Sequence, residues 1–143
     1  KAGYSSRIDN PTFSISTIKR PNFNLLRIEE ELSAAHLRLA HVYIENMHYE
    51  PFIKRFDRPH TFFYIDPPYY GRENYYGKGI FTRDDFKSLR DLLRGIKGKF
   101  IMSINDTKEI QELYKDFRIE RVLTTYNVSG ERQRVTELLI RNF

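Results

Sequence analysis

Residues 62–69 read Phe-Phe-Tyr-Ile-Asp-Pro-Pro-Tyr, and this segment limits the possible folds more than any other part of the chain. The four apolar and aromatic residues at 62–65 predict a buried strand, which Pro67 and Pro68 end because proline fixes φ and lacks a backbone donor. In open α/β sheets, ligands bind outside the carboxyl ends of the strands. The segment therefore predicts an α/β fold with a functional site at Asp66.

The loop after this predicted strand offers hydrogen-bond acceptors and few donors. The acceptors are the carboxylate and the carbonyl of Asp66 and the carbonyl of Pro67, and Tyr69 follows them in the sequence. Such a set suits a planar group that donates hydrogen bonds, such as an exocyclic amine on a nucleobase. The alternative is that Asp-Pro-Pro is only a turn that ends the strand.

The composition agrees with one globular domain that has a polyanionic partner. The 143 residues are 40% hydrophobic and 15% aromatic, which is enough for one core. Lys and Arg number 24 against 19 Asp and Glu, and this excess favours nucleic acid as the partner. No apolar stretch approaches membrane-spanning length, so we expect a soluble cytoplasmic protein without a membrane partner.

Cysteine is absent, which excludes a disulfide framework, a zinc thiolate site and a thiol nucleophile. The last exclusion rules out any reaction that needs a cysteine nucleophile. The four histidines have no carboxylate partner at a metal-ligand spacing, so no metal site is expected.

The first part of the chain predicts an irregular arm followed by helices. Residues 1–23 show no convincing period. Apolar residues then recur at steps of three and four from Leu25 to Val42, which predicts one face of a long helix. Residues 42–44 are β-branched or aromatic and predict a short strand. Residues 48–56 predict a second helix that is broken near Pro51.

The second part predicts two further helices. Thr82 and Asp85 have the spacing of a capping box, and Gly95 and Gly98 are expected to end the helix that they open. Asp106 and Glu109 repeat the capping pattern ahead of another helix, whose apolar stripe runs to residue 117.

The same region predicts strands that complete a sheet. Residues 100–104 form an apolar run, and residues 122–128 and 136–140 each alternate. The polar residues 129–134 join the last two segments, so a terminal hairpin is expected. Strand, helix, strand, helix and hairpin together predict an α/β sheet with an antiparallel edge.

Three segments in series resemble the DNA adenine-N6 methyltransferases, specifically the Dam-like branch that includes phage-type enzymes. They are Phe62–Tyr69, Phe100–Thr107 and Arg132–Ile140, and their order and spacing fit the family. The resemblance covers roughly the second half of such an enzyme. It implies a Rossmann-like sheet and a site-specific enzyme that moves a methyl group from S-adenosylmethionine to adenine N6 in double-stranded DNA. A restriction-modification role and a phage role both stay open.

The resemblance also assigns roles to individual residues. The catalytic motif is Asp66, Pro67, Pro68 and Tyr69. The residues assigned to the cofactor are Glu45, Asn46, Met47 and Asp66. Those assigned to the substrate base or the DNA are Tyr70, Asn105, Arg132 and Arg134.

Plainer roles are open for several residues. Tyr70, Tyr75 and Tyr76 could be pocket walls or ordinary loop aromatics, and residues 76–79 read as a flexible loop over the site. A helix cap is the favoured role of Asp106. The two arginines could be solvated residues of a polar turn.

The chain departs from the family in its first half. It contains no Phe-x-Gly-x-Gly turn for the methionine part of the cofactor and no acidic residue placed to hold the cofactor ribose. We therefore expect a partial sheet that lacks its N-terminal strands and has an exposed or swapped edge at residues 42–44. Residues 1–23 would be a remnant of the target-recognition region, and residues 24–143 a partial catalytic domain.

A partial catalytic domain would need its missing N-terminal strands from another segment or chain. The N-terminal half of the same enzyme or a swapped partner chain would supply them, and the isolated chain is expected to be inactive and to bind S-adenosylmethionine poorly. The alternative is a non-catalytic methyltransferase remnant that binds nucleic acid.

Overall fold

The computed structural model describes residues 3–4, 13–14, 25–128 and 131–143. The chain forms two compact units, residues 1–47 and residues 48–143. No helix among these described residues is long and apolar enough to cross a membrane. The predicted irregular arm at residues 1–23 lies largely outside the described residues.

The first unit contains a short strand pair and one long helix. Strand β1 (Gly3–Tyr4) pairs antiparallel with β2 (Phe13–Ser14). Helix α1 (Leu25–Leu39) confirms the long helix predicted from the apolar stripe. The strand predicted at residues 42–44, with its exposed edge, is wrong, because these residues form an irregular segment. Val, Ile and Tyr favour strands only beside a pairing partner, and within the described chain this segment has none.

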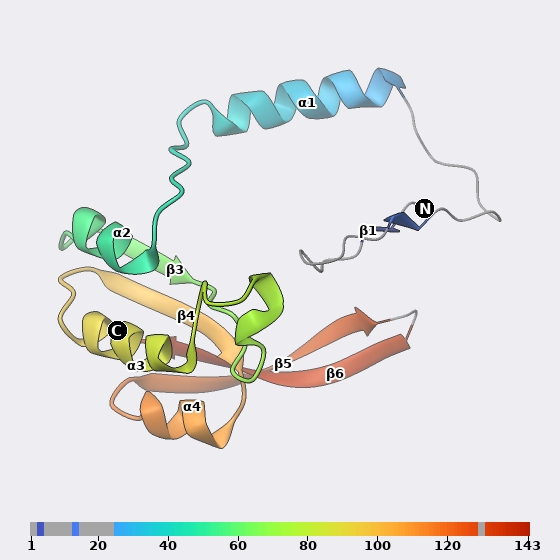
Figure 1. The fold of residues 1–143 in the computed structure, drawn as a ribbon. Coiled ribbons are helices and arrows are strands. Elements are labelled where there is room, and N and C mark those ends of the chain that lie inside the picture. The colour runs from blue at the N-terminus through green and yellow to red at the C-terminus, as the bar shows by residue number, and fades with distance from the viewer. Residues whose placement is uncertain (1–2, 5–12, 15–24, 129–130) are drawn as a thin grey trace. The chain divides into compact units, whose positions relative to one another are not determined.

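The second unit is a mixed α/β fold built on a four-stranded, mostly antiparallel sheet (Figure 1). The sheet order is β3 (Phe62–Ile65), β4 (Lys99–Asn105), β6 (Glu131–Arg141) and β5 (Arg118–Val128). Strand β3 runs parallel to β4, and the other pairs are antiparallel. The strands predicted at 62–65 and 100–104 are confirmed, as is the terminal hairpin. The prediction that β3 is a buried strand is wrong, because Phe62 and Tyr64 are exposed on one of its faces.

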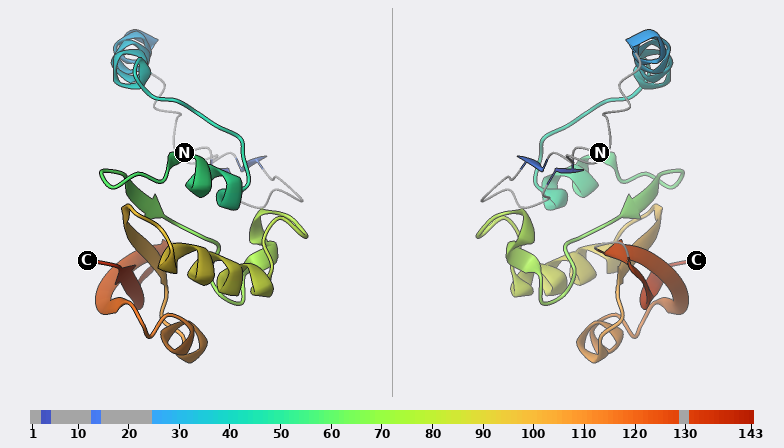
Figure 2. Two further views of the ribbon diagram at one scale, coloured as in Figure 1. Left: turned by 90° about the vertical axis from the view of Figure 1, so that its left-hand side faces the viewer. Right: turned by 90° about the vertical axis from the view of Figure 1, so that its right-hand side faces the viewer.

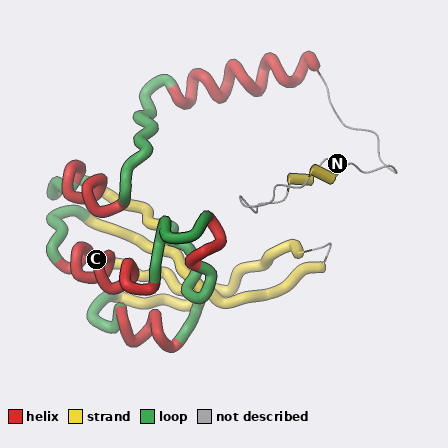
Figure 3. Tube along the Cα trace, in the orientation of Figure 1, coloured by secondary structure: helices red, strands yellow, loops and turns green. Residues whose placement is uncertain are grey.

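The hairpin strands extend beyond the rest of the sheet (Figure 3). Strand β4 pairs with β6 only at residues 137–141, whereas β5 and β6 pair along their whole length. The prediction that residues 131–134 belong to a polar connection is wrong, because they continue β6. These residues pair with β5, and alternate residues exchange backbone N–H and C=O hydrogen bonds with it, so a polar sequence does not prevent strand pairing here. Residues 129 and 130 lie outside the described residues.

Helices α2 (Tyr49–Phe56), α3 (Arg83–Arg94) and α4 (Lys108–Leu113) lie on one side of this sheet (Figure 2). A short 3-10 helix, η1 (Glu73–Tyr76), lies in the connection between β3 and α3. The core between helices and sheet contains Ile53, Phe63, Phe81, Phe86, Leu89, Leu93, Phe100, Met102, Ile104, Ile110, Tyr114, Leu138 and Ile140. The opposite face of the sheet therefore carries the alternate side chains, among them Tyr64, Ser103 and Glu137.

Two predictions about the helix starts are corrected. Helix α2 is not broken at Pro51, because this proline is the third helical residue and its missing N–H would have no partner within the helix. Asp106 is not the cap of α4. Thr107 caps this helix and accepts a hydrogen bond from the Ile110 backbone at 3.3 Å, because the helix begins at Lys108, one residue later than the pattern indicated.

The other helix boundaries follow from local signals. The capping box of Thr82 and Asp85 at the start of α3 is confirmed, and Gly95 is its C-cap. Helix α4 ends at Leu113, earlier than the apolar stripe predicted. Asp106 instead contacts Gln111 and lies 3.0 Å from the guanidinium of Arg121 on β5.

Asp57 fixes the turn before β4. Its carboxylate accepts hydrogen bonds from the backbone N–H groups of Lys97 and Gly98, each at 2.9 Å. These bonds, the one from Lys97 first, hold the pKa of Asp57 below its usual range. A Cβ at Gly98 would stand only 2.7 Å from the carbonyl oxygen of Thr61, so the turn has no room for a side chain there.

Candidate active site

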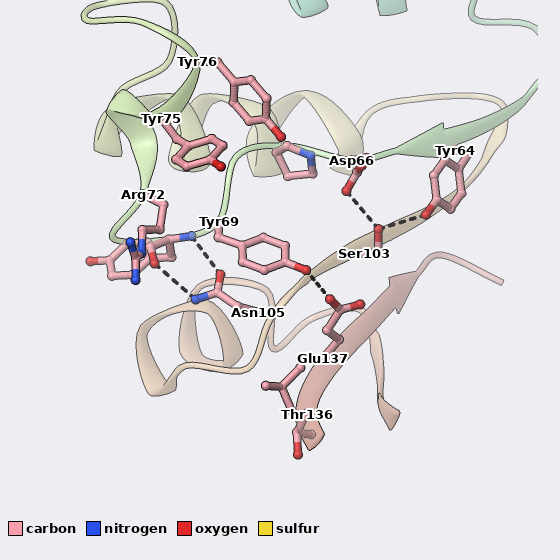
Figure 4. A pocket seen from close by; sticks show the side chains of 13 residues that line it. Tyr64, Asp66, Tyr69, Arg72, Tyr75, Tyr76, Ser103, Asn105, Thr136 and Glu137 are labelled. Carbon is pink, nitrogen blue, oxygen red and sulfur yellow. Dashed lines mark hydrogen bonds between the residues drawn. The ribbon is translucent and has the colours of Figure 1, made fainter. Parts of the chain in front are cut away.

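A cavity of about 820 Å³ lies where β3 and β4 end (Figure 4). Its walls come from the end of β3 and the loop after it, from η1, from β4 and from β6. The lining residues are Tyr64, Asp66, Pro67, Tyr69, Tyr70, Arg72, Tyr75, Tyr76, Ser103, Asn105, Val135, Thr136 and Glu137. The loop predicted to follow β3 therefore forms part of a cavity and is more than a turn.

Asp66 is the first residue of this loop. It follows the last residue of β3, and its side chain is exposed while the next residue, Pro67, is buried. The Asp66 Oδ1 accepts a hydrogen bond from Ser103 Oγ at 3.2 Å. One carboxylate oxygen is thus held from β4, and Asp66 and Pro67 both reach the cavity.

Ser103 is the polar residue within the otherwise apolar stretch Phe100–Ile104 of β4. It is 7% exposed, and its Oγ lies 3.0 Å from the hydroxyl of Tyr64 as well as 3.2 Å from Asp66. The sequence prediction did not include Ser103 or Tyr64 in the site. The available signal was the single hydroxyl in the apolar run Phe100–Ile104, since a buried polar side chain needs a partner.

The ring of Tyr69 is held by its hydroxyl group. Tyr69 donates a short hydrogen bond to Glu137 on β6, a residue 68 positions away in the sequence (Figure 4). Both side chains are half-buried. Glu137 was not predicted. There was little indication in the sequence that Glu137 belongs to the site, because an acidic residue in an alternating strand more often faces solvent.

Asn105 holds the backbone of the residue after Tyr69. Its Oδ1 accepts from the Tyr70 N–H at 2.8 Å, and its Nδ2 donates to the Tyr70 carbonyl at 3.1 Å. Asn105 and Glu137 are also direct partners in the pairing of β4 with β6. Two neighbouring side chains of the sheet therefore fix two successive residues of the loop.

The connection through η1 closes one side of the cavity. Tyr75 and Tyr76 line it and are partly exposed, which favours pocket walls over ordinary loop aromatics. Gly71 and Gly77 flank η1 with φ of 84° and 127°, values that L side chains rarely adopt. Glu73 accepts from the Gly71 N–H at 2.9 Å and anchors the start of this segment.

The structure brings together five predicted residues, which are Asp66, Pro67, Tyr69, Tyr70 and Asn105. Pro68 is half-buried in the same loop and does not line the cavity. The predicted cofactor residues Glu45, Asn46 and Met47 belong to the first unit, whereas residues of the second unit line the cavity.

The two predicted arginines lie on β6. The backbone of Arg132 pairs with Asn127, and its side chain lies outside the described part of the chain. Arg134 is exposed and pairs with Thr125. Among the described residues, no group of three or more His, Cys, Asp or Glu side chains is placed to hold a metal ion.

A comparison with family models identifies the family of the chain that forms this cavity. The family model for D12 class N6 adenine-specific DNA methyltransferases matches residues 9–128. The chain therefore belongs to this family, which confirms the resemblance to Dam-like adenine methyltransferases. A comparison with curated proteins gave no significant match.

Proposed function

We propose that the protein transfers the methyl group of S-adenosylmethionine to N6 of an adenine that is rotated out of double-stranded DNA into the cavity. The observation that carries the proposal is the position of Asp66 and Pro67. Their acceptors lie beside the cavity, next to an aromatic ring that Glu137 holds in place.

The adenine amine is a poor nucleophile because its lone pair is delocalised into the ring. Asp66 Oδ2 and the Pro67 carbonyl would each bind one amine hydrogen, while Asp66 Oδ1 accepts from Ser103. This pulls the nitrogen toward a tetrahedral geometry and aims its lone pair away from the two acceptors. No strong base is needed, because the methylated ammonium is acidic and loses its proton readily.

S-adenosylmethionine supplies the methyl group from a sulfonium, whose carbon–sulfur bond breaks as the nitrogen–carbon bond forms. The carboxylate of Asp66 in the lining fits a cation. Glu45, Asn46 and Met47 would hold the adenine part of this cofactor.

Tyr69 would hold the extruded base by stacking, a contact that contributes about 1–3 kcal/mol. Pro68 would keep the loop rigid between the acceptors and this ring. Tyr70 and Asn105 would complete the wall beside the base. Arg132 and Arg134 on the projecting hairpin would contact DNA phosphates, which position the duplex without reading its sequence.

The sheet is consistent with part of a Rossmann-like methyltransferase domain. In the described chain, β3 pairs with β4 on one side, and its other edge has no partner. We propose that further strands pair with this edge, supplied by other residues of the same enzyme or by a swapped partner chain. The chain alone would then be inactive. A cytoplasmic location of the protein stays a prediction.

Methyl transfer to an adenine-containing duplex, followed with labelled S-adenosylmethionine, tests the proposal on the intact enzyme. Asp66→Ala should abolish transfer and leave the circular dichroism spectrum unchanged. Asp84→Ala removes an exposed carboxylate from the first turn of α3 and serves as the control. Near-normal adenine methylation by Asp66→Ala would refute the assigned role. DNA binding by the wild-type enzyme without any transfer would favour the non-catalytic alternative.

A further inference from the structure

Ser103 is buried on the face of the sheet that points away from α2, α3 and α4. Along β4, Phe100, Met102 and Ile104 point toward the helices and are fully buried. Ser103 alternates with them and is nevertheless only 7% exposed. Its hydroxyl reaches two partners, both on the segment that leads into the catalytic loop.

The direction of these two hydrogen bonds follows from the chemistry of the groups. A carboxylate can only accept, so the single hydrogen of Ser103 is donated to Asp66 Oδ1. The hydroxyl of Tyr64, 3.0 Å from Ser103 Oγ, is then left to donate to Ser103. The three side chains form one directed chain from Tyr64 through Ser103 to Asp66 (Figure 4).

We infer that Ser103 is a positioning residue for Asp66 and that Tyr64 acts through Ser103. This inference rests on the proposed role of Asp66 in binding the adenine amine. Asp66 is exposed, so its carboxylate would otherwise rotate freely about two bonds. The bond to Oδ1 removes this freedom and leaves Oδ2 for an amine hydrogen.

The expected effect is on the rate of the chemical step rather than on DNA binding. A misplacement of about 1 Å in an active site can cost on the order of a hundredfold in rate. We therefore expect Ser103→Ala to lower kcat about tenfold to a hundredfold. The KM for DNA should stay within about twofold, because the phosphate and stacking contacts are intact.

Tyr64→Phe removes only the outer hydroxyl and should lower kcat about threefold, near the weak end for one neutral hydrogen bond. The double variant Ser103→Ala/Tyr64→Phe should match Ser103→Ala within about twofold, because Tyr64 has nothing left to orient. A purely structural role would instead predict losses that add.

The experiment measures kcat and KM for these variants in the intact enzyme, with thermal melting to monitor the fold. Ser88→Ala removes a hydroxyl from the exposed side of α3 and is the matched control. Should Ser103→Ala fail to fold, Tyr64→Phe decides the question, because Tyr64 is 67% exposed and tolerates the change. If Ser103→Ala folds and its kcat is unchanged, the inference is overturned. If Ser103→Ala does not fold, an unchanged kcat in Tyr64→Phe overturns it. Additive losses or an effect on KM alone do so too.

Asp66→Ala in the same assay separates this inference from the proposed function. If Asp66→Ala is inactive while Ser103→Ala keeps wild-type kcat, only the positioning role fails. If Asp66→Ala keeps near-normal activity, the proposed function itself fails.

Discussion

Replacing Glu137 by Gln tests whether the sheet holds the Tyr69 ring, which is proposed to stack on the extruded base. The carboxylate of Glu137 accepts the hydroxyl of Tyr69, and the amide of Gln can still accept but carries no charge. A hydrogen bond to a charged acceptor contributes about 1.5–3 kcal/mol and a neutral one about 0.5–1.5 kcal/mol. Because both side chains are half-buried, the lower ends apply, which leaves a loss of about 1 kcal/mol.

A loss of about 1 kcal/mol corresponds to roughly a fivefold decrease in kcat/KM. Tyr69→Phe removes the whole bond and should cost about 1.5 kcal/mol, or roughly tenfold. The double variant Tyr69→Phe/Glu137→Gln should equal Tyr69→Phe alone, because Glu137 acts through the hydroxyl that is already gone.

Two measurements check this prediction. Single-turnover methyl transfer gives the rate, and 2-aminopurine at the target position reports stacking, since its fluorescence rises when the extruded base is no longer stacked. Glu120→Gln on β5 changes an exposed carboxylate that pairs with Arg141 and should leave both readings unchanged. The reasoning is refuted if Glu137→Gln matches wild type in both assays or if the double variant shows additive losses.

Two further predictions concern stability and DNA binding. Asp57→Ala should lower the free energy of unfolding at pH 7 by about 1.5 kcal/mol, as measured by denaturant titration, because the Lys97 and Gly98 N–H groups lose a charged acceptor. The pKa of Asp57 is lowered in the folded state, so its contribution is fully present above its unfolded pKa of about 3.9. This contribution is lost as the pH falls through the pKa of Asp57 in the folded state. If Asp57→Ala remained less stable than the wild type below that pH, the argument would be contradicted. Arg134→Ala should weaken DNA binding equally for all sequences and reduce the slope of log K against log salt concentration by about 1. An unchanged slope would remove Arg134 from the phosphate contacts.

Features encoded by neighbouring residues were predictable from the sequence. The capping box of α3 is one example, because Thr82 and Asp85 satisfy each other across three residues. The strand before Asp66 is another, because the apolar run and the two prolines define both its body and its end. The prediction of a strand at residues 42–44 was wrong, because strand formation depends on a pairing partner that the local sequence does not specify.

The supports of the site could not be predicted in this way. Ser103 and Asp66 are 37 residues apart, and Tyr69 and Glu137 are 68 apart. Only the pairing of β3 with β4 and of β4 with β6 brings these side chains together. Their residue types are common on strands, so the sequence alone carries little signal for their roles.

The two prolines explain why the loop needs these distant supports. Pro67 and Pro68 make the backbone stiff but remove the N–H groups with which a loop would fix itself. The sheet supplies the missing contacts, since Ser103 holds Asp66, Glu137 holds Tyr69 and Asn105 holds the next residue. The proposed acceptors for the amine and the proposed ring for the base are thus set by the register of β4 and β6. The same strand β6 carries Arg134 farther out on the hairpin, so one element would link the contact with DNA to the placement of the base.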